Sequence, residues 1–275
     1  MELLKAVIFG IVEGLTEWMP VSSTGHMLLL NDFMPLNVTE EFYKLFEVVI
    51  QLGAILAVVV LYFKVLFPWG FGKKKKDTIN TFNLWGKILV ACVPAAVIGI
   101  FFDDWIEENF FNSTVVAVML ILYGIIFIIM ESANVGSKST KDVTKVTYKQ
   151  ALGVGIFQLL SLIPGTSRSG ATIIGGLLVG LERKVAAEFT FFLAVPVMAG
   201  ASLLKGVKYI KNVGLSFADG ELMILVVSCL VAFIVSLAVI KFILNYIRKH
   251  DYKCFGWYRI VLGVIVLVYF AIKGF

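Results

Sequence analysis

Charged side chains are scarce in this sequence. Asp, Glu, Lys and Arg together make up 16% of its 275 residues, whereas a soluble domain contains about 25%. Apolar residues supply 59%, against roughly 45–50% in soluble domains. This shortage of charge argues against a soluble fold and favours a chain that crosses a membrane several times.

Cysteine is also rare, and no metal-binding spacing is present. The three cysteines lie far apart in the sequence and receive no role beyond packing: Cys92, Cys229 and Cys254. A basic leader is missing too. Residues 1–5 do not form a basic leader, and two acidic residues interrupt the apolar stretch that follows, so we expect the N-terminus to be kept.

The small excess of positive charge does not indicate a nucleic-acid partner. The net charge is +5, but the basic residues cluster in short loops between apolar runs. Such clusters set the orientation of a membrane protein. We therefore expect this chain to lie in a membrane and to bind no nucleic acid.

Long apolar runs dominate the sequence. A bilayer core is about 30 Å thick and requires about 20 mostly apolar residues per helix. Six runs meet this need, centred on residues 48–63, 88–102, 115–130, 189–204, 222–240 and 260–272. Two further apolar stretches, 6–30 and 151–181, are broken by Gly, Pro, hydroxyl and ionisable residues. The fold class predicted is an all-α polytopic membrane protein.

Charge bias predicts the orientation of these runs. Three basic loops are expected in the cytoplasm, namely Lys73 to Lys76, Lys138 to Lys149 and Arg248 to Lys253. The acidic turn at 103–108 then faces outward. Stretch 151–181 must enter the membrane and return as a re-entrant hairpin, although the outer loop so created carries Lys205, Lys208 and Lys211.

An internal repeat supports this arrangement. Each half of the chain opens with a broken motif and continues with three spans, and the motif starting at Pro20 aligns with the one starting at Pro164. Three spans per copy is an odd number, so the second copy must be inverted, a plan that places broken helices face to face near the midplane. We predict one integral membrane domain over 1–275, with repeats at 1–133 and 150–275.

The first motif holds two acidic residues at membrane depth. Glu13 and Glu17 are four residues apart and project from one helix face. Burying each charge costs roughly 3 kcal/mol on insertion scales, so packing alone does not explain them. They also lie near the negative end of the half-helix that Pro20 stops. We therefore predict that they bind a cation or shuttle protons.

Hydroxyl groups follow the break. Ser22, Ser23 and Thr24 are good N-caps for a second half-helix, whose free N–H groups would form an anion site. His26 follows Ser23 by three residues, close enough on a helix to accept a hydroxyl proton. Ser23 is the best candidate nucleophile, with His26 as its base or orienting group.

The second motif repeats the break, the hydroxyl cluster and the helix start. It contains Ser167 and Ser169 and adds Arg168. We predict that these three residues bind phosphate together with Ser22 and Thr24. A guanidinium can grip phosphate oxygens with two donors and can also balance the two carboxylates. Neither motif has the glycine spacing followed by Lys of a nucleotide P-loop, so a soluble nucleotide is not indicated.

These motifs resemble a known family. The strings Glu13-Gly-Leu-Thr-Glu-Trp-Met-Pro-Val-Ser-Ser-Thr-Gly-His26 and Pro164-Gly-Thr-Ser-Arg-Ser-Gly-Ala-Thr172 are similar to the two motifs of the undecaprenyl-pyrophosphate phosphatases, the bacitracin-resistance proteins. The resemblance covers essentially the whole chain, including its length and span order. No departure occurs at any motif position.

The resemblance implies an activity and a place. The family hydrolyses undecaprenyl pyrophosphate to the monophosphate carrier of bacterial wall synthesis, in the inner (plasma) membrane, at a site that opens outward. It implies that a divalent metal assists. Mg²⁺ or Ca²⁺ is the expected ion, and Glu13 and Glu17, predicted above to bind a cation or shuttle protons, are its candidate ligands. The functional positions carried over are Glu13, Glu17, Ser22, Ser23, Thr24, His26, Ser167 and Arg168. A homodimer is left open.

Several alternatives remain at this point. Water could attack directly, with Glu17 or Glu13 as base and Ser23 only a ligand. Glu47 and Gln51 could line the lipid or cation path, or only pack between helices. A transporter that flips the lipid monophosphate would need the same phosphate cradle. A non-catalytic lipid-binding scaffold leaves the intramembrane Glu, His and Arg residues unexplained.

Overall fold

The computed structural model describes residues 1–69, 75–135 and 140–274, and the described chain is helical apart from turns and one isolated bridge between Thr140 and Leu181. Lys73, Lys74 and Lys138 of the predicted cytoplasmic loops lie outside the described residues, and so do the side chains of Lys75 and Lys76. The fold is therefore all-α over the described ranges, as the sequence predicted.

Within the described residues, six helices are long and apolar enough to cross a membrane. Each overlaps one of the six predicted runs, and the structure bounds them as α3 (Glu40–Leu61), α5 (Lys75–Phe110), α6 (Ser113–Ser132), α9 (Arg183–Val213), α10 (Glu221–Ile247) and α11 (Lys253–Lys273). The predicted number of spans is confirmed. Two short elements, α4 (Phe63–Leu66) and η1 (Val143–Lys145), belong to the connections.

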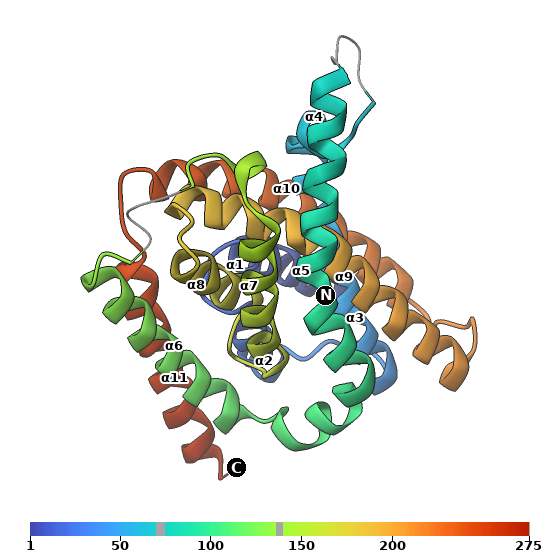
Figure 1. Ribbon diagram of the computed structural model, residues 1–275. Coiled ribbons are helices and arrows are strands. Elements are labelled where there is room, and N and C mark those ends of the chain that lie inside the picture. Colours follow the sequence, from blue (N-terminus) through green and yellow to red (C-terminus); the bar gives the residue numbers. More distant parts are fainter. Residues whose placement is uncertain (70–74, 136–139, 275) are drawn as a thin grey trace.

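The two interrupted stretches form pairs of short helices. The first pair is α1 (Glu2–Thr16) with α2 (Ser23–Phe33), and the second is α7 (Tyr148–Gln158) with α8 (Arg168–Leu178), joined through the 3₁₀ turn η2 (Leu159–Leu162). All four short helices lie near the centre of the view in Figure 1, with α6 and α11 to one side and α5, α9 and α3 to the other. The long helices thus surround the two broken stretches.

Each pair returns to the end from which it started. In the first, Lys5 Nζ donates to the Pro35 carbonyl at 2.6 Å, and Asn37 N–H donates to the Glu2 carboxylate at 3.0 Å. In the second, the side-chain amide of Gln150 donates to the Val179 carbonyl at 3.2 Å. The two ends of each pair therefore lie close together, and the break lies between its two helices.

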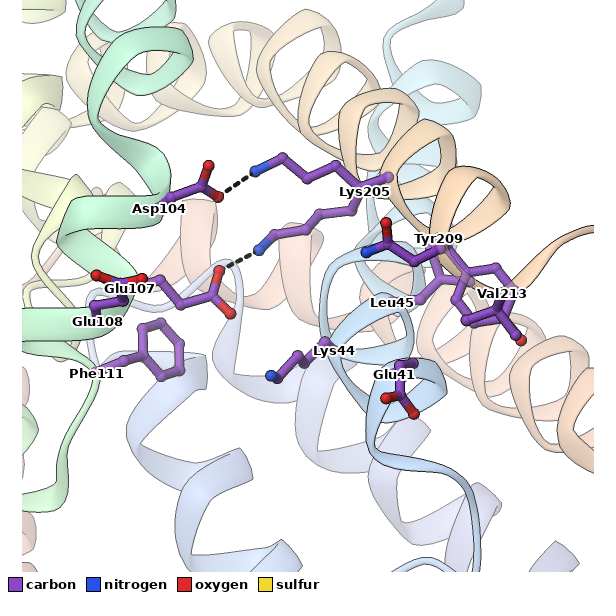
Figure 2. A pocket seen from close by; sticks show the side chains of 12 residues that line it. Glu41, Lys44, Leu45, Asp104, Glu107, Glu108, Phe111, Lys205, Tyr209 and Val213 are labelled. Carbon is purple, nitrogen blue, oxygen red and sulfur yellow. Dashed lines mark hydrogen bonds and ion pairs between the residues drawn. The ribbon is translucent and has the colours of Figure 1, made fainter.

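One end of the bundle gathers the acidic turn. Lys205 of α9 pairs with Glu107 at 2.5 Å, and Lys208 pairs with Asp104 at 2.7 Å. Figure 2 shows these bridges crossing a pocket of about 640 Å³ between α5, α9 and α3, with Lys44 on its α3 wall. Two of the three lysines that the predicted topology left in an outer loop are therefore neutralised by the acidic turn.

The opposite end joins the loops that follow α6 and α10. Glu131, at the end of α6, accepts hydrogen bonds from the Arg183 guanidinium and, at 3.2 Å, from the Tyr252 N–H. The Lys87 side chain reaches the Thr144 carbonyl at 2.8 Å. Segments predicted to lie on the cytoplasmic side therefore meet at one end, and the acidic turn lies at the other.

Helix α1, which carries the two acidic residues, is held tightly against α10. A Cβ placed on Gly14 would lie 2.8 Å from the Ala232 carbonyl oxygen, which no side chain can tolerate without a shift. The Ser228 hydroxyl donates to the Ala6 carbonyl at 2.9 Å across the same contact. Small residues at such contacts let helix backbones approach closely in membranes. This packing fixes the depth of Glu13 and Glu17.

Candidate active site

The two broken motifs lie against each other, as the sequence predicted. Arg168 Nη2 donates to Glu17 Oε1 at 2.9 Å, and Ser169 Oγ donates to the Met19 carbonyl at 3.1 Å. A cavity of about 170 Å³ lies at this junction. Both motifs, η2 and the walls α3 and α9 line it, and the lining includes Glu17, Ser23, Thr24, Gln51, Ser161, Ser167, Arg168 and Ala201.

The two half-helices that start at the cavity share one unusual cap. Ser22 and Ser167 precede α2 and α8, both with φ of 70°, and their hydroxyls accept the N–H of Gly25 at 3.4 Å and of Gly170 at 3.1 Å. Positive φ is strained for a residue with a Cβ, and such strain concentrates at functional sites. Ser22 and Ser167 therefore have equivalent positions in the structure. In the sequence alignment of the two motifs, Ser167 instead aligns with the next residue, Ser23.

Glu17 is the centre of the polar contacts. Its side chain is buried, and each of its oxygens has a donor: Arg168 at Oε1 and the Ser23 hydroxyl at Oε2, 2.7 Å away. The arginine also donates to the Thr190 carbonyl at 3.0 Å, while its buried Nε–H has no partner among the described residues. An unmade donor beside a cavity is suited to an anion.

His26, expected as the base or orienting group of Ser23, has no hydrogen bond to Ser23 among the described residues. Its Nδ1 lies 2.8 Å from the Ser22 carbonyl, which can only accept, so Nδ1 carries a proton. Its Nε2 lies 2.6 Å from the Tyr258 hydroxyl, and the two rings stack. Both ring nitrogens are thus engaged elsewhere. The Ser23 hydroxyl donates to Glu17 Oε2 instead, at 2.7 Å.

Two hydroxyls predicted to bind phosphate are placed behind the cavity wall. Ser22 is 1% exposed and Ser169 is 2% exposed, and neither lines the cavity. Ser22 caps α2, and Ser169 fixes the contact between the two motifs through Met19. Thr24 and Ser167, in contrast, do line the cavity. The structure therefore gives Ser22 and Ser169 a supporting position.

Glu13 is 1% exposed and, unlike Glu17, does not line the cavity. One of its oxygens, Oε1, is buried without a hydrogen-bond partner among the described residues, and its electrostatic neighbours are Glu17, Glu47 and Arg168. The described chain contains no group of three His, Cys, Asp or Glu side chains arranged for a metal ion. Mg²⁺ often takes one or two carboxylates plus substrate phosphates. The free Glu13 oxygen fits that mode and not an all-protein cage.

A further charged residue at the site escaped the sequence analysis. Arg259 of α11 is fully buried and donates to main-chain carbonyls of both breaks, including Pro20 at 3.2 Å and Gly165 at 2.9 Å. It lies near the start of an apolar span and only a few residues after a basic loop. That position is typical of an interfacial arginine, so sequence alone gave no reason to place it beside the motifs.

Comparison with known proteins places the chain in a family. The family described as "Bacitracin resistance protein BacA" matches residues 6–265. An "Undecaprenyl-diphosphatase" of Enterococcus faecalis is 55% identical over 274 residues, covering 98% of both chains, and one of Desulfitobacterium hafniense is 54% identical, covering 99% of this chain and 97% of its own. "Undecaprenyl-diphosphatase 1" of Clostridioides difficile is 56% identical over 270 residues, covering 98% of this chain and 97% of its own. With a match over nearly its whole length and both motifs joined at one cavity, this chain belongs to the BacA bacitracin resistance family.

Proposed function

We propose that this chain is a membrane-embedded undecaprenyl-diphosphatase. It removes the terminal phosphate of undecaprenyl diphosphate, releases inorganic phosphate and returns the monophosphate carrier to bacterial wall synthesis. The activity would also confer the bacitracin resistance for which the matched family is named. The observation that carries the proposal is the Ser23–Glu17–Arg168 chain of hydrogen bonds at the cavity where the two motifs join.

Ser23 is the proposed nucleophile and Glu17 its base. The hydroxyl gives its proton to Glu17 Oε2, and its oxygen attacks the terminal phosphorus in line with the bridging oxygen. The bond from phosphorus to that bridging oxygen breaks, and the lipid monophosphate leaves. Water then hydrolyses the phosphoserine, and the serine oxygen recovers a proton. Direct attack by a water on Glu17, with Ser23 as a ligand, is the alternative route.

Arg168, Ser167 and the two helix starts are proposed to hold the transferring phosphoryl group. The N-termini of α2 and α8 both begin at the cavity, so their free N–H groups and positive dipole ends face the same space. Arg168 contributes its unpaired Nε–H and is already oriented by Glu17 and by the Thr190 carbonyl. Preorganised donors of this kind stabilise charge that develops in the transition state.

His26 and Glu13 do not line the cavity and assist this chemistry from outside it. His26 binds the Ser22 carbonyl and so steadies the strained cap beside the nucleophile. Glu13, with its free oxygen, would hold a Mg²⁺ or Ca²⁺ ion together with phosphate oxygens, and Glu17 is the second carboxylate at hand. When bound, such an ion would neutralise phosphate charge.

The topology that we propose is a pair of inverted repeats, residues 1–133 and 150–275, within one membrane domain. Each repeat would consist of a re-entrant hairpin followed by three spans. Two observations support this topology. Hydrogen bonds join the two ends of each short-helix pair, and these joined ends lie at opposite ends of the bundle. The helix caps at Ser22 and Ser167 also match. Irregular backbone at membrane depth is tolerated where it lines a cavity.

The site is proposed to open outward, at the end that carries the acidic turn. The basic loops favour a cytoplasmic position for the other end. Helices α3 and α9 line both pockets, at different turns. Gln51 and Ala201 line the cavity where the motifs join, and Lys44 and Lys205 line the pocket beside the acidic turn, called the outer pocket below. Glu47 lies one turn from Gln51 and between these levels, with Lys205 and Glu107 as electrostatic neighbours. The polar side chains of Gln51, Glu47, Lys44 and Lys205 thus form a route for water and phosphate between the two pockets.

A transporter is the rival function, since two broken-helix pairs that meet between the ends of a bundle also build secondary carriers. Purified protein in detergent distinguishes the phosphatase from the transporter, because transport cannot be observed where no compartments exist. We expect release of inorganic phosphate from undecaprenyl diphosphate in that preparation. Intact substrate in detergent, combined with movement of lipid phosphate across sealed vesicles, would support the carrier instead.

A further inference from the structure

Arg259 is a buried arginine that the proposed reaction does not use. Its side chain is fully buried, and its guanidinium lies over the Tyr123 ring at 5.6 Å. No carboxylate in the described part of the chain forms an ion pair with it. An unpaired buried charge is costly unless hydrogen bonds satisfy it. The structure must therefore gain something specific from this residue.

The hydrogen bonds of Arg259 all go to main-chain carbonyls of three segments. They reach Pro20 in the first break, Gly165 and Thr166 in the second break at 2.9 and 3.0 Å, and the α6 carbonyls of Met119 and Leu120 at 3.4 Å. One side chain thus ties both breaks to α6. A planar guanidinium with five N–H donors can do this, and an ammonium group cannot.

These bonds also fix the direction of one peptide unit. In a planar trans peptide the C=O and the following N–H point in opposite directions. Because the Thr166 carbonyl points at Arg259, the Ser167 N–H points away from it. Ser167 lines the cavity, and no hydrogen bond occupies its N–H among the described residues. The N–H of the preceding unit, Thr166, is instead used by the Ile163 carbonyl at 3.2 Å.

We propose that Arg259 is a positioning residue that turns the Ser167 N–H into the cavity, where it donates to an oxygen of the transferring phosphoryl group. Arg259 itself touches no substrate. It acts by binding the carbonyls of Pro20, Gly165 and Thr166. The Ser167 N–H is then left pointing away from Arg259, toward the cavity. The inference rests on the proposed phosphatase function and adds a residue and a donor to that site.

The test is Arg259→Lys in the full-length protein, with Lys253→Gln on the same helix as the matched control. Lysine keeps the charge and cannot hold carbonyls of two breaks and α6 together. Loss of one preorganised transition-state donor costs on the order of 10² to 10³ in kcat. We expect a fall of that order per folded molecule, a KM within about threefold of the parent, and weaker inhibition by orthovanadate, which mimics the transferring phosphoryl group. Lys253→Gln should leave all three unchanged.

A second variant guards against misfolding. Tyr123→Leu keeps the guanidinium and removes the ring on which it lies, so a smaller fall in kcat with the same unchanged KM is expected. Folded Arg259→Lys protein with parental kcat and orthovanadate inhibition would overturn the proposal, and so would a Tyr123→Leu variant with unaltered kcat. A parent protein that releases no phosphate would instead refute the phosphatase function, which separates the two failures.

Discussion

The hydroxyl of Ser23 donates a 2.7 Å hydrogen bond to Oε2 of Glu17, six residues earlier in the chain. The break after α1 makes this contact possible, since on one continuous helix residues six apart do not face each other. The other oxygen of Glu17 is bound by Arg168 of the second motif. A hydroxyl, a proton acceptor and a fixed cation are thus aligned across the two halves of the chain.

Glu17→Gln should nearly abolish turnover. The amide can still accept a hydrogen bond from Ser23, but it cannot take the proton. General-base catalysis contributes about 10² to 10⁴ in rate, so kcat should fall by that order. Steady-state phosphate release measures the change. Glu41→Gln, on the wall of the outer pocket, is the control and should stay within about twofold of the parent. Comparable rates in Glu17→Gln and parent would remove Glu17 from the chemistry.

His26→Gln should be much milder than Glu17→Gln. Both ring nitrogens of His26 are engaged by groups other than Ser23, so its loss loosens the cap at Ser22 without removing the base. We expect kcat to fall by about tenfold, from the lost positioning alone. The ratio of the two variants is the informative quantity. A His26→Gln defect as deep as that of Glu17→Gln would return the proton-acceptor role to the histidine.

Cysteines at Met19 and Ser169 should be joined by a short bifunctional thiol reagent within one molecule. The Ser169 hydroxyl lies 3.1 Å from the Met19 carbonyl, although the two residues are 150 positions apart. The experiment requires a background without Cys92, Cys229 and Cys254. A cysteine at Phe33, at the far end of α2, replaces the one at Met19 in the control and should not react with position 169. Linked product between two molecules, and none within one, would contradict the joined motifs.

Arg168→Lys separates two roles of the arginine. If the planar fork grips phosphate, lysine should lower kcat by a factor on the order of 10² with the fold retained. Arg168→Ala should in addition destabilise the protein, because removing one partner of a buried pair costs about 3–5 kcal/mol. Thermal unfolding in detergent and phosphate release together distinguish the effects. Near-parental release by Arg168→Lys would limit Arg168 to balancing the charge of Glu17.

Much of the fold was predictable because membrane insertion leaves a strong pattern. Six apolar runs and two interrupted stretches are visible in the sequence, and each appears in the structure at its expected place. The meeting of the motifs was also predictable, because charged and hydroxyl groups at membrane depth must find partners. Arg168 and Glu17 are such a pair.

The partner of each site residue was harder to predict. A spacing of three residues suggested that His26 would serve Ser23. In the structure Ser22, between Glu17 and these two residues, has a positive φ, Ser23 donates to Glu17, and His26 Nε2 lies beside the Tyr258 hydroxyl. Positive φ at a serine has no sequence signal. Arg259 was missed for a related reason, since its partners are carbonyls from three distant segments, and carbonyls are present in every residue.

Phosphate release by Ser23→Ala, measured beside the parent on undecaprenyl diphosphate in detergent, tests the central claim most directly. The claim is that the hydroxyl bound to Glu17 forms the new bond to phosphorus. We predict that Ser23→Ala is made in parental amounts, binds the lipid and releases no phosphate above background, and that acid quenching of the working parent traps phosphate on Ser23. Substantial turnover by the alanine variant, with no phosphoserine in the parent, would contradict the claim and leave water as the nucleophile.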